Sequence, residues 1–242
     1  MLNRRRSLLL TLILAFSITS CRQAERTSTE TPPLEEVVSN TPPFKTKEPV
    51  RYRAVRTITQ TDSNGRTTTV KTNIFKDGPS RREELEVPNT PLLVYLEKGG
   101  ERFLLLPDEK IYAEVDSRFS LSESVDDNAT ESSPDRVLHT EAVQTKYQKL
   151  PAEVLDGKPV TKYKVTVNNA SSESVSNNVT LFWIDENLGM PVKSEMSSAD
   201  GFRTTMELSA ISFEVNQADF EIPTTYRRVS APELIGRTKR AE

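Results

Sequence analysis

Side chains that could act as nucleophiles or metal ligands are scarce in this chain of 242 residues. It contains one histidine, His139, and one cysteine, Cys21. A zinc site needs three or more histidine, cysteine or carboxylate ligands, and no Ser-x-Gly elbow lies near His139 to give it a catalytic partner. We therefore expect no enzymatic activity, no metal and no cofactor, with His139 at the surface. The chemistry that remains is modification of the Cys21 thiol.

The residues before Cys21 have the order of a secretory signal. Residues 4–6 are all arginine, and residues 8–16 are almost wholly apolar. A membrane-spanning helix needs about 20 apolar residues, and this stretch offers about half that number. The sequence therefore predicts a signal peptide over residues 1–20. Its end, ITSC at residues 18–21, resembles the bacterial lipobox, in which a branched apolar residue and two small residues precede a cysteine.

The lipobox resemblance implies a lipid anchor on Cys21. In that family the thiol receives a diacylglycerol, the signal is cut just before the cysteine, and the new amino terminus is acylated, commonly with palmitate. Several acyl chains provide the two or more signals that stable membrane attachment requires. Arg22 is not the aspartate that keeps many enteric lipoproteins at the inner membrane. We expect a bacterial envelope protein, at the outer membrane and facing the periplasm if the organism has two membranes. The alternative is an ordinary signal that happens to contain a cysteine.

Composition and charge restrict the other possibilities. The formal net charge is −3, so the chain does not have the excess of basic residues that nucleic-acid binding requires. Hydrophobic residues make up 35% of the chain, below the usual ~45–50%, so part of it should not be packed. The Thr-, Glu-, Ser- and Pro-rich residues 21–48 read as the lipidated cysteine and a disordered tether, unless they fold back on the domain. Residues 49–229 form the predicted domain, with residues 117–135 and 168–178 as polar loops. Residues 230–242 read as a flexible tail.

Alternating apolar residues and tight-turn signals predict a mainly β domain. Asn64-Gly65 separates two alternating segments, residues 50–60 and 66–75, as expected for a hairpin. Similar signals recur along the domain and give about ten strands in one curved antiparallel sheet. The loop 185–189 reads as a hairpin turn rather than a calcium site. Residues 134–142 are the helical candidate.

Several motifs of the domain resemble the LolA-like lipoprotein-carrier superfamily, the group of LolA, LolB, LppX and LprG. The resemblance covers residues 50–229 and implies an unclosed barrel, with one or two short helices or loops as a lid over its concave side. In this superfamily the concavity holds acyl chains without chemistry. The matching positions are Gly157, Tyr163, Trp183, Ile184, Asp185, Gly189, Pro191, Phe220, Ile222, Pro223 and Tyr226.

The sequence thus predicts a monomeric envelope lipoprotein that binds a lipid, an acyl chain or a lipoprotein in a half-barrel cavity. The alternative is a lipid-anchored sensor or interaction scaffold with a filled half-barrel, as in the RseB-type stress regulators. A carrier and a scaffold differ in whether the inward side chains leave room for a ligand. The candidate cavity-lining residues, chosen by alternation, are Tyr52, Leu85, Tyr95, Phe103, Leu105, Tyr112, Trp183 and Met206.

Overall fold

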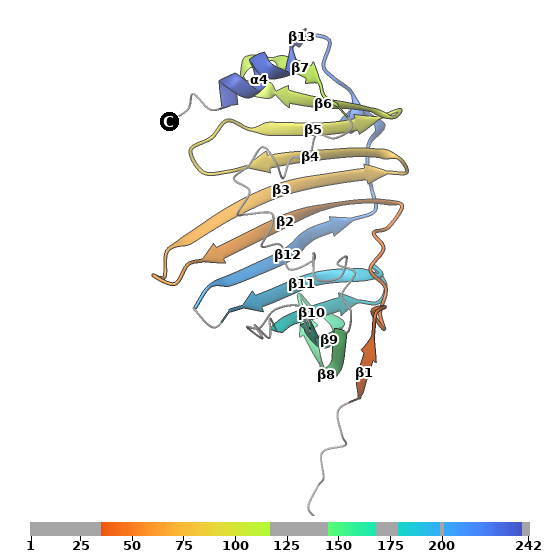
Figure 1. The fold of residues 1–242 in the computed structure, drawn as a ribbon. Helices are drawn as coiled ribbons and strands as arrows, with labels where there is room; N and C mark the ends of the chain where they lie inside the picture. Colours follow the sequence, from red (N-terminus) through yellow and green to blue (C-terminus); the bar gives the residue numbers. More distant parts are fainter. Residues whose placement is uncertain (1–34, 117–144, 168–178, 199–200, 239–242) are drawn as a thin grey trace, which may run out of the picture. The chain divides into compact units, whose positions relative to one another are not determined.

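The computed structural model describes residues 35–116, 145–167, 179–198 and 201–238, which all belong to one unit. These residues form one sheet of 13 strands, drawn as arrows in Figure 1. Its strands are β1 (Glu36–Ser39), β2 (Arg51–Thr61), β3 (Thr67–Asp77), β4 (Ser80–Glu86), β5 (Leu93–Lys98), β6 (Glu101–Leu106), β7 (Ile111–Glu114), β8 (Thr145–Leu155), β9 (Lys158–Val167), β10 (Val179–Asp185), β11 (Met190–Ser197), β12 (Arg203–Ser212) and β13 (Arg227–Arg228).

Two antiparallel meanders make up almost the whole sheet. Strands β2 to β7 follow one another, as do β8 to β12, and the pairing of β12 with β2 joins the two meanders. Strand β1 pairs with β8 at one edge, and β13 pairs in parallel with β7 at the other. Because the edges do not meet, the sheet is an unclosed barrel. The predicted fold class is confirmed, with the short parallel strand β13 as the departure from a purely antiparallel sheet.

The predicted turns have the backbone geometry that their residues favour. Gly65 lies between β2 and β3 with a φ of +80°, a conformation that a side chain would disfavour. Between β10 and β11, the Asp185 carboxylate accepts backbone hydrogen bonds from Asn187 at 2.9 Å and Leu188 at 3.1 Å. The loop 185–189 is therefore a hairpin turn, as predicted.

The sheet has two faces that differ in what covers them. Residues directly opposite one another on paired strands point to the same side, so the register assigns each residue to a face. We call the face that carries Tyr52, Ile74 and Met206 the first face. The opposite one, which carries Leu105 and Trp183, is the second face.

The N-terminal segment 36–48 is part of the domain, which corrects the predicted tether over these residues. Strand β1 extends the sheet, and the Phe44 ring then packs on the first face. Its centroid lies 6.0 Å from that of Tyr147, 4.7 Å from Tyr163 and 6.2 Å from Phe182. Aromatic contacts of this kind add to the free energy of apolar burial, and they hold a segment whose composition alone suggests disorder.

The C-terminal segment crosses the second face and ends on the first. A 3-10 turn, η2 (Gln217–Phe220), places Phe220 in the core of the second face. Helix α4 (Ala231–Thr238) then covers β6 and β7 on the first face (Figure 1), where Leu234 is fully buried. Another 3-10 turn, η1 (Pro107–Glu109), links β6 to β7. The predicted flexible tail is thus corrected for residues 231–238.

Several predictions concern residues outside the described ranges. These are the signal peptide with Cys21, His139, the polar loops 117–135 and 168–178, and the helical candidate 134–142. Within the described ranges, no helix has the length and apolar character needed to cross a membrane.

Candidate functional site

The eight candidate cavity residues lie on both faces of the sheet. In β6, Leu104 is opposite Tyr95 on the first face, so its neighbours Phe103 and Leu105 point to the second. The segment ERFLLL is apolar at four successive positions, and alternation alone could not decide which of them face inward. The assumption that all eight share one cavity is corrected by the register. Tyr52, Leu85, Tyr95 and Met206 lie on the first face, and Phe103, Leu105, Tyr112 and Trp183 lie on the second.

Three of the second-face residues belong to a filled core. Leu105 is 1% exposed and packs with Phe220 and Val215 from the crossing C-terminal segment. Phe103 and Tyr112 flank this core, with their ring centroids 6.2 Å apart. Their role is to join the C-terminal segment to the sheet.

Trp183 is held by a charged shell on the second face. Its indole Nε1 donates a hydrogen bond of 2.7 Å to Glu153, and the Lys162 and Lys193 ammonium groups lie 4.6 Å and 5.4 Å from the ring centroid. Hydrogen bonds from Lys162 and Trp183 lower the pKa of Glu153. These contacts occupy the polar atom and the π-face of the indole, so Trp183 is a structural residue of this face.

A pocket of about 250 Å³ lies on the neighbouring strands and contains several charged side chains. It lies against the irregularity in β12 at Ala210, whose φ is +51°. Lys193 and Glu207 in its wall form an ion pair of 2.5 Å. This pair neutralises two of the charges in the wall.

The first face divides into regions along the sheet. Leu85 and Tyr95 pack into the cluster beneath α4, around Leu104 and Leu234. Tyr52 and Met206 belong to a separate cluster in the middle of the sheet, and within the described residues that cluster contains strand residues alone. Its buried members are Tyr52, Ala54, Ile74, Met206 and Leu208, with Ile58, Met190 and Ile211 packed against them.

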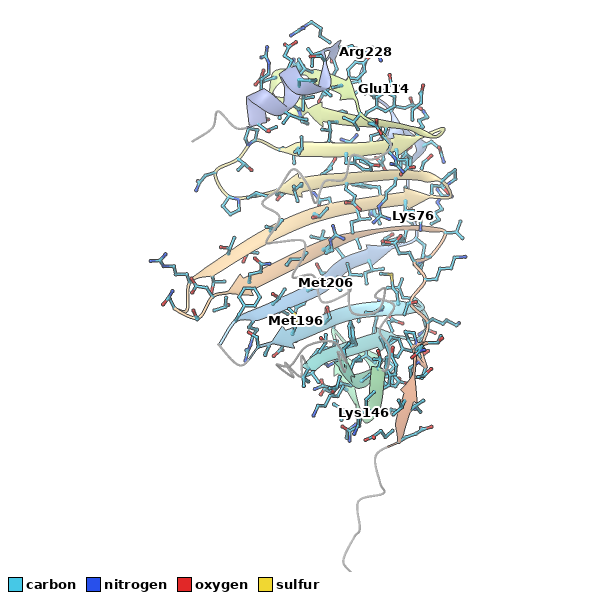
Figure 2. All side chains as sticks on the ribbon, in the orientation of Figure 1. Lys76, Glu114, Lys146, Met196, Met206 and Arg228 are labelled. Carbon is cyan, nitrogen blue, oxygen red and sulfur yellow. The ribbon has the colours of Figure 1, made fainter. Side chains whose placement is uncertain are left out.

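Hydroxyl groups lie beside this apolar cluster. Thr180, Ser194 and Thr204, on β10, β11 and β12, are each 0% exposed. None of their side-chain oxygens has a hydrogen-bond partner in the described part of the chain. Figure 2 labels Met196 and Met206, the methionines of β11 and β12 that are their neighbours. These three residues were not among the candidates predicted from the sequence. The pattern that could have identified two of them is their spacing: Thr180 is two positions from Phe182 and Thr204 is two positions from Met206, so each points to the same face as its apolar neighbour.

A network of charged residues borders the cluster. The Glu48 carboxylate accepts hydrogen bonds from Tyr52 Oη at 2.8 Å, Lys76 Nζ at 2.9 Å and Arg81 Nη1 at 2.8 Å. Arg81 also donates from Nε to Glu83 at 2.6 Å. Glu48 precedes β2, so the network ties the N-terminal segment to the first face.

Burial and the contacts of this network shift the pKa values of Glu48, Tyr52 and Arg81. Burial by itself would raise the pKa of Glu48, but the hydrogen bonds and charges of Arg81 and Lys76 lower it from 4.5 to about 2. Burial and the Glu48 charge raise the pKa of Tyr52. Burial opposes the charge of Arg81, yet Glu83 and Glu48 outweigh it and raise its pKa. These shifts keep Glu48 charged, Tyr52 neutral and Arg81 charged near neutral pH, which suits a structural tie rather than proton transfer.

The described residues contain no group of three or more histidine, cysteine, aspartate or glutamate side chains that could hold a metal ion. What the first face offers chemically is apolar contact, neutral hydroxyls and a compensated charge network. Such a surface can bind a ligand by burial and hydrogen bonding.

Comparisons by sequence give no relative: no protein-family model and no curated protein matches this chain. Solved structures do match. The Mycobacterium tuberculosis lipoprotein LppX is 15% identical with a TM-score of 0.40, over 69% of this chain and 89% of that chain. A LolA superfamily protein from Nitrosomonas europaea is 12% identical with a TM-score of 0.32, over 75% and 92%.

A third similar structure is the MucA/MucB complex of Pseudomonas aeruginosa. MucB is 11% identical with a TM-score of 0.42, and the match covers 74% of this chain but 59% of that chain. This chain therefore spans little more than half of MucB. The protein from Nitrosomonas europaea is described as a member of the LolA superfamily, the group that the sequence motifs resemble.

Proposed function

We propose that this chain is a lipid-anchored protein of the bacterial envelope that binds an acylated molecule on the first face of its half-barrel, without chemistry. The observation that carries the proposal is the strand-only apolar cluster around Tyr52, Ile74 and Met206. An amphipathic sheet must cover its apolar face with another layer. Among the described elements, segment 44–48 and helix α4 pack at separate parts of this face. An acyl ligand is suited to the region between them.

The composition of this region suits acyl chains. Met206 is in the cluster and Met196 points to the same face beside it, and methionine adapts its shape to irregular apolar partners. Each buried methylene contributes about 0.8 kcal/mol. A chain of about twelve methylenes therefore supplies roughly 10 kcal/mol before ordering costs, enough for micromolar affinity.

The lipid anchor on Cys21 limits where the binding face can operate. Residues 22–35 connect the anchor to β1, and a chain of that length reaches at most about 50 Å when fully extended. The domain is therefore kept close to the bilayer, where acylated molecules are present. We propose that it works as a monomer that takes up or presents such a ligand.

One observation favours the alternative of a filled scaffold. Tyr52, Ile74 and Met206 are exposed by 0%, 2% and 1%. If side chains of the same molecule fill the first face permanently, the domain presents a surface to a protein partner instead of holding a lipid. The two functions predict opposite results for the lipid content of the purified protein.

The test is lipid extraction followed by mass spectrometry. The protein is exported with a cleavable signal and Cys21→Ser, so that no anchor lipid is present, and is purified without detergent. We expect an acylated lipid at close to one molecule per chain, and its loss in the folded variant Met206→Lys. A folded wild type that carries no lipid, even after incubation with envelope lipids, would favour the scaffold.

A further inference from the structure

We propose that Thr180, Ser194 and Thr204 form a polar subsite on the first face that binds the uncharged ester or amide carbonyl groups of an acylated ligand. The inference rests on the proposed function and specifies which part of the ligand is recognised. It predicts a preference for molecules with several acyl carbonyls over plain hydrocarbon chains.

The register brings the three hydroxyl residues together around Met196. Thr180 lies directly opposite Met196 from β10, and Thr204 lies directly opposite it from β12. Ser194 is two positions from Met196 on β11 and lies opposite Met206. All three residues therefore point to the first face, as do Met196 and Met206, which Figure 2 labels.

These hydroxyls are unfavourable unless something binds them. Each residue is 0% exposed and each oxygen lacks a hydrogen-bond partner in the described part of the chain. Buried polar groups in native proteins are nearly always hydrogen-bonded, and an exception calls for an explanation. Valine has the shape of threonine without the hydroxyl and would avoid the penalty at positions 180 and 204. Three such groups on adjacent strands indicate a ligand that supplies the missing partners.

Spacing and charge define the chemical class of that ligand. Adjacent strands lie about 4.8 Å apart, which separates the backbones of Thr180 and Thr204 by roughly 10 Å and places Ser194 roughly 8 Å from each. One carbonyl cannot reach all three hydroxyls, whereas a ligand with two or three acyl carbonyls can. The residues directly opposite them are uncharged: Val165, Met196, Gln60, Phe182 and Met206. A neutral ester or amide fits this setting better than a carboxylate or phosphate, which would need a paired cation.

The experiment compares probes that differ in their carbonyl groups. Exported protein with Cys21→Ser is titrated with a pyrene-labelled diacylglycerol and with a pyrene-labelled alkane of the same chain length. The test variant combines Thr180→Val, Ser194→Ala and Thr204→Val. The control is Thr205→Val, on the opposite face of the same strand. Circular dichroism and thermal unfolding are measured on each ligand-free protein.

We expect the triple variant to bind the diacylglycerol at least about tenfold more weakly, the factor that one or two lost hydrogen bonds produce. Its affinity for the alkane should stay within about twofold of wild type, and its unfolding midpoint without ligand should rise. Thr205→Val should leave both affinities unchanged. Competition by a triacylglycerol and by a synthetic triacylated lipopeptide then distinguishes a storage-type lipid from a lipoprotein terminus, and competition by either supports the subsite.

The unfavourable outcomes are distinguishable. If the triple variant binds each probe with the same affinity as wild type, the subsite is refuted, while the proposal of acyl binding stands. If the folded wild type binds neither probe, the proposed function fails and the subsite with it.

Discussion

Replacing Glu48 by glutamine should release the N-terminal segment from the first face and destabilise the domain. The carboxylate neutralises Lys76 and Arg81 at 2.9 Å and 2.8 Å. Glutamine has nearly the same shape but no charge, so it leaves two half-buried cations without this counter-ion. Removing one partner of a buried ion pair is more destabilising than losing an exposed pair, because the remaining charge stays desolvated.

The magnitude follows from the pKa of Glu48. Its fall from 4.5 to about 2 corresponds to at most about 3.4 kcal/mol, at ~1.36 kcal/mol per pH unit. The Glu48 side chain is 29% exposed, so solvent screening reduces this figure, and Arg81 keeps its bond to Glu83. We expect Glu48→Gln to lower the free energy of unfolding by about 2 kcal/mol at pH 7.

The pH dependence gives the diagnostic result. Because the folded-state pKa lies below the ordinary value, the stabilisation is complete above about pH 4.5 and is lost as the pH falls toward 2. The difference between wild type and Glu48→Gln, measured by urea unfolding, should therefore be constant from pH 7 to 5 and shrink between pH 4 and 2.5. Glu101→Gln, at an exposed position, is the control and should change stability by less than about 0.5 kcal/mol. A Glu48→Gln effect as small as the control, or one that persists at pH 2.5, would refute the network's role.

Three further predictions concern the anchor, the second face and the helix. Cys21→Ser should abolish palmitate labelling and move the protein from the membrane to the soluble fraction; unchanged fractionation would count against lipidation. Leu105→Lys should unfold the domain, as monitored by circular dichroism, because a buried unpaired ammonium costs several kcal/mol; a folded variant would contradict the filled core of the second face. Leu234→Ala should lower the free energy of unfolding by about 2–4 kcal/mol; a loss below about 0.5 kcal/mol in urea would show that α4 does not contribute to the fold.

The local parts of the fold could be predicted from the sequence. Hairpin turns depend on a few adjacent residues, so Asn64-Gly65 and the loop 185–189 were identified correctly. A chain of such hairpins gives the two meanders, whereas the pairing of β12 with β2 that joins them is long-range. The fold class could therefore be predicted from the sequence alone.

Contacts between residues that lie far apart in the chain could not be predicted from the sequence. Residues 36–48 look like a linker by composition, and what orders them is Phe44 on Tyr163 and Glu48 on Arg81, partners far along the chain. The start of helix α4 does have a local sequence signal, because serine is a preferred N-cap residue. In the structure the Ser230 hydroxyl accepts a hydrogen bond from the backbone N–H of Glu233. Its burial through Leu234 depends on the sheet beneath it.

The candidate site was only partly predictable for a similar reason. Alternation grouped Tyr52 with Met206, and the register places both on the first face. It failed at Phe103 and Leu105, where apolar residues stand side by side on both faces of a strand covered from both sides. The buried hydroxyls resemble ordinary surface residues until the pairing register places them.

Titration of the exported Cys21→Ser protein with a fluorescent fatty acyl probe shows whether the first face binds an acyl chain, with Met206→Lys and Thr205→Lys compared side by side. These substitutions add the same charge to adjacent residues of β12 that point to opposite faces. We expect micromolar binding, about 8 kcal/mol, by wild type and Thr205→Lys, and binding at least about tenfold weaker by a folded Met206→Lys. A folded wild type that does not bind the probe, together with a Met206→Lys variant that unfolds, would contradict this expectation and make the first face a filled core.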